Sequence, residues 1–397
     1  MTRLAPRAVA LAVACSVALS GRLAAQQPTP PNPPRPGGQP GALAQTPPAP
    51  LSGVLFGNFQ YHTEPGAAES NNTDRFDVDR AYITVRLPAG DRASVRATAD
   101  LFKSTTTGYD LRFKYAYLQY EYVKPRTAGA LAALARVGIL HTVVIDHEET
   151  FWPRWIAQVA TERARFFSSS DVGVSTLLTL PHALGEVYGT VTNGPGYVDA
   201  GSDDRFKDYA LRLSLTPFGQ RRGLLRTLTL SPWAYKGDTA SGFVSSVSDP
   251  VTGTLGPIPH GLKRDRWGMF AGIRDPHLVI GADYAERTDE AESGENTTAS
   301  PVTVGSTTGS VVSLYSIVRP FQLAAGEAAA PLGVVLRWDR TKPDKSADAN
   351  ATFLVGGLTW DLTSRVAVAF DYQEQLSHEG ATAPVAKVYF AHFVANF

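Results

Sequence analysis

The sequence lacks the features by which many exported and membrane proteins are recognised. Its 397 residues contain one cysteine, Cys15, so no disulfide can form within the chain. No stretch reaches the roughly 18 consecutive apolar residues that a membrane-spanning helix needs. Lysine and arginine number 37, and so do aspartate and glutamate. This balance argues against a nucleic-acid partner, because such a partner needs a strong field of one sign.

The N-terminus predicts export. Two arginines precede an apolar run at residues 8–19, and small residues follow at Ser20 and Ala25, which is the pattern of a secretory signal peptide. We therefore predict a signal peptide over residues 1–25, with cleavage after either small residue. The alternative is a lipoprotein acylated at Cys15, but Ala12 stands where such signals usually carry leucine.

A proline-rich segment follows the predicted signal. Residues 26–50 hold 10 prolines in 25 positions, so they favour an extended chain and cannot build a core. We predict a disordered linker here, and a periplasmic tether to peptidoglycan is the alternative. Residues 51–397 then form the folded domain.

From residue 51 onward, apolar residues recur at every second position in runs of mostly 9–13 residues. A period of two indicates strands, and these lengths suit a tilted strand that crosses a bilayer. The predicted strands cover residues 52–62, 75–87, 91–103, 109–122, 132–142, 171–181, 184–194, 205–217, 224–236, 263–274, 276–287, 309–319, 331–341, 351–361, 364–376 and 385–397. In the fourth strand the predicted apolar face is Tyr109, Leu111, Phe113, Tyr115 and Tyr117.

The connections between these runs support a closed barrel. Short turns such as residues 274–276 and 362–364 alternate with long segments such as 143–170 and 237–262, as in outer-membrane barrels. The last strand places Tyr389, Ala391, Phe393, Ala395 and Phe397 on one apolar face. We predict that this strand pairs with the first, so that no sheet edge is left open.

A secreted β-sandwich or propeller is the competing fold. Its strands would be shorter, and its enclosed face would be apolar. Here the second face of the strands carries Arg, Lys, Asp, Thr and Ser throughout, which only a water-filled lumen accommodates. The predicted fold class is thus an all-β, transmembrane antiparallel β-barrel of about 16 strands.

At this point the sequence resembles bacterial outer-membrane porins, specifically the phosphate-selective porin O and P family. The resemblance covers about residues 53–397 and is carried by the ordered stretches "RVGILHTVVIDHEETFWPRW", "SSSDVGVSTLLTLP", "GTVTNGPGYVD", "KDYALRLSLTPF", "VGGLTWDLTSRVAVAFDYQ" and the terminal "FVANF". It implies a homotrimeric barrel through which small hydrophilic solutes diffuse passively. It also implies that the long loop after the fifth strand, residues 143–170 here, folds into the pore as a constriction loop.

The alternation of the strands selects the residues of the lumen. The predicted pore-lining, anion-binding residues are Arg80, Arg86, Arg96, Arg112, Lys114, Arg212 and Arg337, which Arg136 can join. The alternative is a solvated lining in which these bases pair with lumenal acids such as Asp100, Asp283, Asp339 and Asp371. As a set the bases favour inorganic anions such as phosphate, because charges that line a narrow pore select the ions passing it.

The constriction loop mixes both signs of charge. Its predicted charged residues are Asp146, Glu148, Glu149, Arg154, Glu162, Arg163 and Arg165. Facing acids and bases would create a transverse field across the pore, as general porins use. Trp152 and Trp155 are expected to pack the loop on the wall.

Other functions find less support in the residues. The "IDHEET" segment offers possible metal ligands, but adjacent residues rarely converge on one ion, and no His-Glu-x-x-His motif occurs. An outer-membrane lipase would need a Ser/His pair on the lipid-facing wall, but His392 is expected to face inward and no nucleophile motif accompanies it. We therefore expect a channel without cofactor, metal or enzyme activity, embedded in outer-membrane lipid. A non-conducting structural or adhesin barrel is the alternative.

Overall fold

The computed structural model describes residues 50–64, 74–104, 108–127, 129–198, 206–239, 247–248, 255–256, 261–294, 303–326, 329–378 and 385–397. The predicted signal peptide and all but the last residue of the predicted linker lie outside these ranges. No helix among the described residues is long and apolar enough to cross a membrane.

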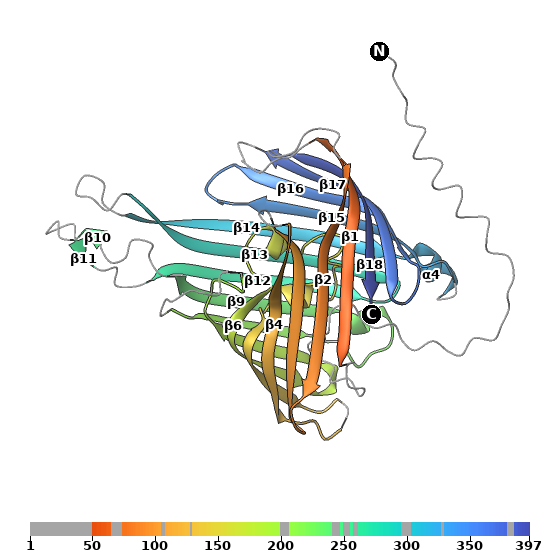
Figure 1. Cartoon of the computed structure of the whole chain (residues 1–397), viewed down its shortest axis with the longest axis horizontal. Coiled ribbons are helices and arrows are strands. Elements are labelled where there is room, and N and C mark those ends of the chain that lie inside the picture. The colour runs from red at the N-terminus through yellow and green to blue at the C-terminus, as the bar shows by residue number, and fades with distance from the viewer. Residues whose placement is uncertain are drawn as a thin grey trace, which may run out of the picture. The chain divides into compact units, whose positions relative to one another are not determined.

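The described residues from Leu51 onward form a closed antiparallel barrel of sixteen strands (Figure 1). The strands are β1 (Leu51–Glu64), β2 (Asp74–Pro88), β3 (Ala93–Ser104), β4 (Gly108–Val123), β5 (Ala132–His141), β6 (Ser170–Leu180), β7 (Gly185–Thr192), β8 (Asp208–Leu215), β9 (Thr229–Thr239), β12 (Leu262–Arg274), β13 (Leu278–Ser293), β14 (Thr303–Val318), β15 (Leu332–Lys342), β16 (Asn350–Asp361), β17 (Val366–His378) and β18 (Ala386–Asn396). Two further strands, β10 (Val247–Ser248) and β11 (Leu255–Gly256), pair with each other in the connection after β9. The predicted fold class and strand number are confirmed.

The barrel closes between its first and last strands, as predicted. β18 pairs antiparallel with β1, from Val54 opposite Asn396 down to His62 opposite Val388. On β18, Tyr389 and Phe393 are exposed on the outer face, whereas His392 is buried on the lumenal face. Closure gives every barrel strand two neighbours, so the backbone hydrogen bonds that lipid cannot satisfy are made within the sheet.

Some strand ends differ from the prediction for identifiable reasons. β9 begins at Thr229 rather than residue 224, because residues 224–227 form a 3-10 turn after Gly223, whose φ of +86° a turn requires. β13 and β14 are longer than predicted, and Figure 1 shows them projecting beyond their neighbours. In their outer parts, hydroxyl side chains on the paired strands bond to each other, as Thr288 and Thr308 do at 2.9 Å. Because these positions are polar, the outer parts show little apolar alternation.

One predicted face is wrong. Thr98 of β3 pairs with Tyr115 of β4, but the next residue, Ala99, pairs with Phe113, so Lys114 is an extra residue in a β-bulge. A bulge shifts the period of two by one position. Leu111 and Phe113 therefore face outward, but Tyr115 and Tyr117 lie in the lumen and are buried.

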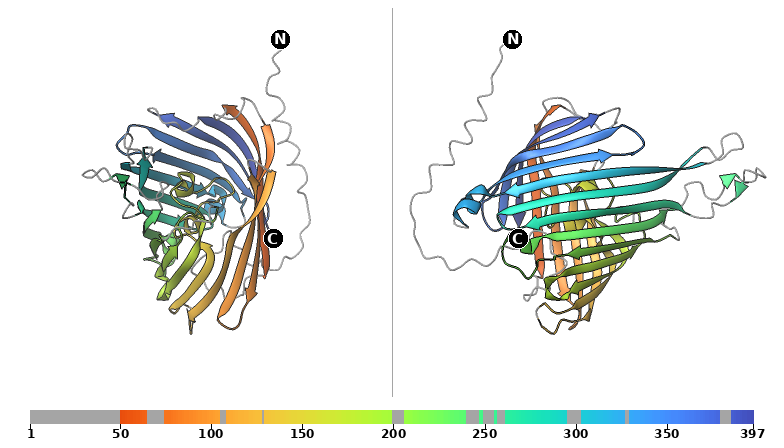
Figure 2. Two further views of the ribbon diagram at one scale, coloured as in Figure 1. Left: turned by 60° about the vertical axis from the view of Figure 1, so that its left-hand side comes forward. Right: turned by 180° about the vertical axis from the view of Figure 1, so that it is seen from behind.

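The connection between β5 and β6, residues 142–169, is here termed the inward loop. It contains two single-turn helices, α2 (Ile145–Glu148) and α3 (Ala160–Arg163). Figure 2 shows it inside the ring of strands, as predicted. A third short helix, α4 (Pro320–Ala325), lies in the connection between β14 and β15.

Candidate functional site

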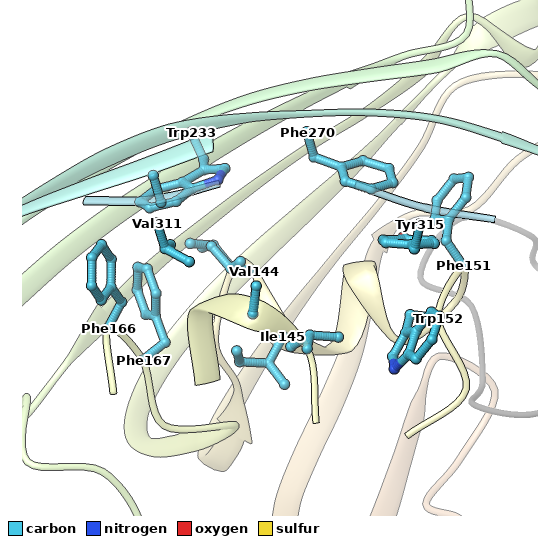
Figure 3. Packing of buried hydrophobic residues seen from close by; sticks show 14 of the residues in the cluster. Val144, Ile145, Phe151, Trp152, Phe166, Phe167, Trp233, Phe270, Val311 and Tyr315 are labelled. Carbon is cyan, nitrogen blue, oxygen red and sulfur yellow. The ribbon is translucent and has the colours of Figure 1, made fainter. Parts of the chain in front are cut away.

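The inward loop is a folded unit with its own apolar core, not an extended flap. Its side chains pack against the lumenal faces of the strands from β9 to β16 (Figure 3). The buried members from the loop are Val143, Val144, Ile145, Phe151, Trp152, Ile156, Val159, Ala160, Phe166 and Phe167. Their wall partners include Trp233, Phe270, Val311, Tyr315, Val335 and Phe353. Burial of this apolar surface holds the loop on one side of the lumen.

Aromatic pairs fix the loop's position on that wall. The ring centroids of Phe151 and Phe270 lie 4.7 Å apart, and those of Trp152 and Tyr315 lie 5.1 Å apart. Trp152 is fully buried. Trp155 lies edge-on to His392 at 6.3 Å. Both tryptophans thus pack the loop on the wall, because such tilted contacts are favourable geometries for aromatic rings.

Polar contacts from the wall bind the loop backbone. Arg212 donates to the carbonyl oxygen of Val143 and forms an ion pair with Glu186. Arg337 donates to the carbonyl oxygen of Gln158 at 2.7 Å. These two predicted pore-lining bases point into the barrel, but their exposed fractions are 1% and 4% because the loop covers them. We therefore assign them to loop anchoring, which corrects their predicted place on the open pore.

The other predicted bases cluster on the opposite wall, formed by β2, β3 and β4. Arg80 and Arg112 each lie 3.3 Å from the same carboxylate, that of Asp100. Arg86 donates to the hydroxyl of Ser52 at 3.1 Å. We call the set Arg80, Arg86, Arg96, Arg112 and Lys114 the basic wall.

Two further members of the basic wall, Arg96 and Lys114, contact aromatic rings instead of a carboxylate. The guanidinium of Arg96 lies 4.7 Å from the ring centroid of Tyr115 and 3.1 Å from Nε2 of His141. The ammonium of Lys114 lies 4.7 Å from the ring centroid of Tyr82, and this side chain is buried, with an exposed fraction of 3%. Neither cation has a carboxylate within ion-pair distance among the described residues. Ring contacts stabilise a cation without neutralising it.

The inward loop presents its own charges to this wall. Arg154 lies between two carboxylates, 2.5 Å from Glu149 and 3.0 Å from Glu162. Burial acts to raise the pKa of Glu162, but Arg154, with Lys114 and Arg80 further off, brings that pKa below its usual value. Arg96 of the wall lies 3.1 Å from His141, which lies 2.9 Å from Asp146 of the loop, so the loop and the basic wall face each other. The space between them is here called the gap.

The remaining predicted loop residues have different surroundings. Asp146 pairs with Nδ1 of His141 at 2.9 Å. Glu148 is buried between the loop and the wall with an exposed fraction of 3%. Arg163 stacks 3.5 Å from the ring centroid of Phe353, and Arg165 is exposed. Of the predicted constriction residues, Glu149, Arg154 and Glu162 therefore come together opposite the basic wall, and Asp146 reaches Arg96 of that wall through His141. Glu148, Arg163 and Arg165 lie elsewhere.

Sequence reasoning missed the aromatic residues of this gap. Tyr197, in the connection after β7, donates to Asp100 at 3.5 Å, and its ring centroid lies 4.5 Å from the guanidinium of Arg112. It lies in a Gly-Pro-Gly-Tyr turn outside any strand, so alternation could not indicate its direction. Tyr82 does follow the alternation and could have been found on the lumenal face of β2.

No group of three or more His, Cys, Asp or Glu side chains in the described ranges is placed to hold a metal ion. The arrangement places charges of both signs on the two facing sides of the lumen. Charges so placed can act on an ion between them.

Comparison with known proteins identifies the fold. No family model and no curated protein matches the chain. Solved structures do: OmpF of Salmonella typhi in complex with daunomycin is 11% identical, with a TM-score of 0.56 over 87% of this chain and 97% of that chain. The outer membrane channel DcaP of Acinetobacter baumannii is 12% identical, with a TM-score of 0.54 over 87% and 96%. The in-vitro folded trimer form of OmpT from Vibrio cholerae is 11% identical, with a TM-score of 0.52 over 87% and 98%.

At these identities the likeness concerns the fold, which is that of outer-membrane porin barrels. It shows the fold and no more than the fold. Membership of the phosphate-selective porin family stays a prediction from the sequence.

Proposed function

We propose that this chain is a porin, a water-filled channel for passive diffusion of small hydrophilic solutes across the outer membrane, with a preference for inorganic anions, phosphate among them. Export by the segment at residues 1–25 and assembly as a homotrimer belong to the same proposal. The trimer form of the similar OmpT barrel supports the latter.

The observation that carries the anion preference is the charge imbalance across the gap. Five bases form the basic wall, and among the described residues only Asp100 binds them as an acid within ion-pair distance, taking two of the five. The facing side of the loop holds Arg154 with Glu149 and Glu162. A solute in a narrow gap is close to these charges and is poorly screened by salt, so the excess of positive charge favours anions.

The basic wall also explains how an anion could pass without being trapped. Arg80 and Arg112 share Asp100, and Arg96 and Lys114 lie on tyrosine rings. Arg80 and Arg112 are thus partly neutralised, whereas Arg96 and Lys114 keep their full charge, so that successive sites attract an anion with different strengths. Conduction requires binding that is favourable enough for entry and weak enough for exit.

Reconstitution of the full chain in planar lipid bilayers tests this function. Under a gradient of potassium chloride, the reversal potential of a channel that prefers anions has the same sign as the equilibrium potential of chloride. A reversal potential with the sign of the potassium equilibrium potential would refute the anion preference. Liposome swelling in neutral sugars separately decides between a channel and a non-conducting structural barrel, because only a channel admits the sugar.

A further inference from the structure

A small enclosed cavity lies between the inward loop and the strands β13, β14 and β15. Its volume is about 10 Å³, which is room for one water molecule. Glu148 and Val159 line it from the loop, and Asp283, Tyr315 and Arg337 line it from the wall. Figure 3 shows the same junction, where Trp152 of the loop meets Tyr315.

The cavity has more acids than bases. Glu148, Asp283 and Asp339 are exposed by 3%, 4% and 3%, and Arg337 by 4%. Arg337 binds Asp339 through two nitrogens, at 2.8 and 2.7 Å, and the hydroxyl of Ser313 donates to Asp339 at 2.7 Å. The single guanidinium is thus committed to Asp339, which leaves Glu148 and Asp283 without an ion-pair partner in the described part of the chain.

Hydrogen bonding compensates these two carboxyl groups only in part, since the backbone amide of Tyr284 acts on Asp283 and side-chain donors are few. One oxygen of Glu148 accepts from the hydroxyl of Thr161 at 3.1 Å, but its other oxygen, Oε1, has no partner. No side chain in the described ranges donates to either oxygen of Asp283, and the buried hydroxyl of Tyr315 also lacks a partner. Two ionised carboxylates in one enclosed site repel each other and lose their hydration, so they do not both stay ionised there.

We propose that Glu148 and Asp283 form a proton-binding site that fastens the inward loop to the wall. One carboxyl group keeps a proton and donates it toward the other, directly or through one water molecule in the cavity. Since Glu148 belongs to the loop and Asp283 to β13, the shared proton joins the two. Loss of that proton leaves like charges on both sides of the junction and loosens the loop.

The charges around Glu148 agree with this role. Burial raises the pKa of Glu148 well above its usual value, and the negative charge of Asp283 raises it further. Thr161 of α3 and Arg337 of β15 act in the opposite direction, and Asp339 of β15 adds to the increase. The remaining titratable group at the cavity is the hydroxyl of Tyr315 on β14.

The sign of the pH dependence follows. One carboxyl group is protonated when the loop is docked and ionised when the loop is released. Docking of the loop is therefore coupled to the uptake of a proton. Docking is therefore strongest below the usual range for glutamate and weakens as the pH rises toward the raised value, by up to about tenfold per pH unit. The loop is expected to loosen as the pH rises from the usual range of glutamate toward this raised pKa.

Thiol labelling of the full chain in membranes tests the site without relying on conduction. Cys15 is the one native cysteine, so Val159→Cys places a reporter thiol at the buried cavity, where Val159 is exposed by 3%. The labelling rate is measured between about pH 6 and about pH 10 in this variant alone and in combination with Glu148→Gln, which mimics the protonated acid. Glu290→Gln is the matched control, because Glu290 lies on the same strand as Asp283 but binds the backbone of Lys263 instead.

The labelling rate is expected to rise with pH in the Val159→Cys variant and in the same variant carrying Glu290→Gln. This rise should be at least about tenfold larger than the rise in the variant that combines Val159→Cys with Glu148→Gln. Asp283→Asn serves as a second neutral variant should Glu148→Gln fail to assemble. Equal pH profiles for the reporter variant and an assembled neutral variant would overturn the proposal. The porin proposal would then still stand, because conductance is measured separately.

Discussion

The backbone of Phe397 is hydrogen-bonded in both directions to Gly53. The amide of Phe397 donates to the carbonyl oxygen of Gly53 at 3.0 Å, and the amide of Gly53 donates back at 2.8 Å. A side chain on Gly53 would meet the Phe397 ring, since a Cβ there would lie 2.1 Å from its Cζ. The last residue thus extends the pairing of β18 with β1 beyond Asn396, and its ring covers the backbone of the first strand.

Deletion of Phe397 is expected to impair assembly of the barrel. The deletion removes both backbone hydrogen bonds at the closing seam and uncovers Gly53, whose polar groups must be satisfied within the sheet in lipid. Heat-modifiable mobility on gels, together with the amount of protein in the membrane, measures the effect. Phe397→Leu is the control and should assemble nearly as wild type, because it keeps the backbone pairing. Equal assembly of the deletion variant would contradict this role.

Removing positive charge from the basic wall is expected to weaken the anion preference. The double variant Arg112→Ala, Lys114→Ala removes a base paired with Asp100 and a base without a carboxylate partner. The reversal potential in a salt gradient should shift toward the value for cations, because Asp100 then keeps one basic partner, Arg80. A matched control is Arg365→Ala, which lies in the turn before β17, outside the gap. An unchanged reversal potential at low salt would show that ions do not pass along this wall.

Neutralising an acid of the loop should shift the reversal potential in the opposite direction. Glu149→Gln leaves Arg154 bound to Glu162 and removes one negative charge from the gap. The same change at Glu148, which the sequence placed in the constriction, should have little effect on selectivity near neutral pH because that side chain is buried behind the loop. Equal shifts for the two variants would contradict the placement of Glu148.

Arg212→Met is expected to destabilise the docked loop. The change removes the donor to Val143 and leaves Glu186 buried without its partner, and breaking a buried ion pair costs about 3–5 kcal/mol. Single-channel recordings should then show larger conductance fluctuations, and the inward loop should become sensitive to protease. Combining it with Glu186→Gln should recover part of the loss, since the unpaired charge is gone. Protease resistance equal to wild type would rule out this anchoring role.

The segment at residues 26–50 is expected to contribute nothing to conductance. Its prolines lack the amide that strand pairing needs, and β1 begins at Leu51. A chain with residues 26–50 deleted should show the conductance and ion preference of the full chain in planar bilayers. A changed conductance would mean that this segment reaches the pore.

The sequence by itself determined the number of strands, their order along the chain and the closure of the barrel. These properties depend on local alternation, which each strand carries independently, and on the terminal strand with Phe393 and Phe397 on its outer face. The lumenal direction of Arg80, Arg96 and Arg112 followed from the same pattern, although bulges interrupt it at Asp79, next to Arg80, and at Lys114, after Arg112.

Only the tertiary structure decided which lumenal residues border the open path. The extra residue Lys114 turns Tyr115 and Tyr117 inward, and nothing in the alternation marks where a bulge will form. Arg212 and Arg337 carry the same pattern as the basic wall, yet the loop packs over them. The side on which the loop lies depends on contacts between residues far apart in sequence, such as Trp152 with Tyr315, and a repeat of two positions along one strand contains no information about such contacts.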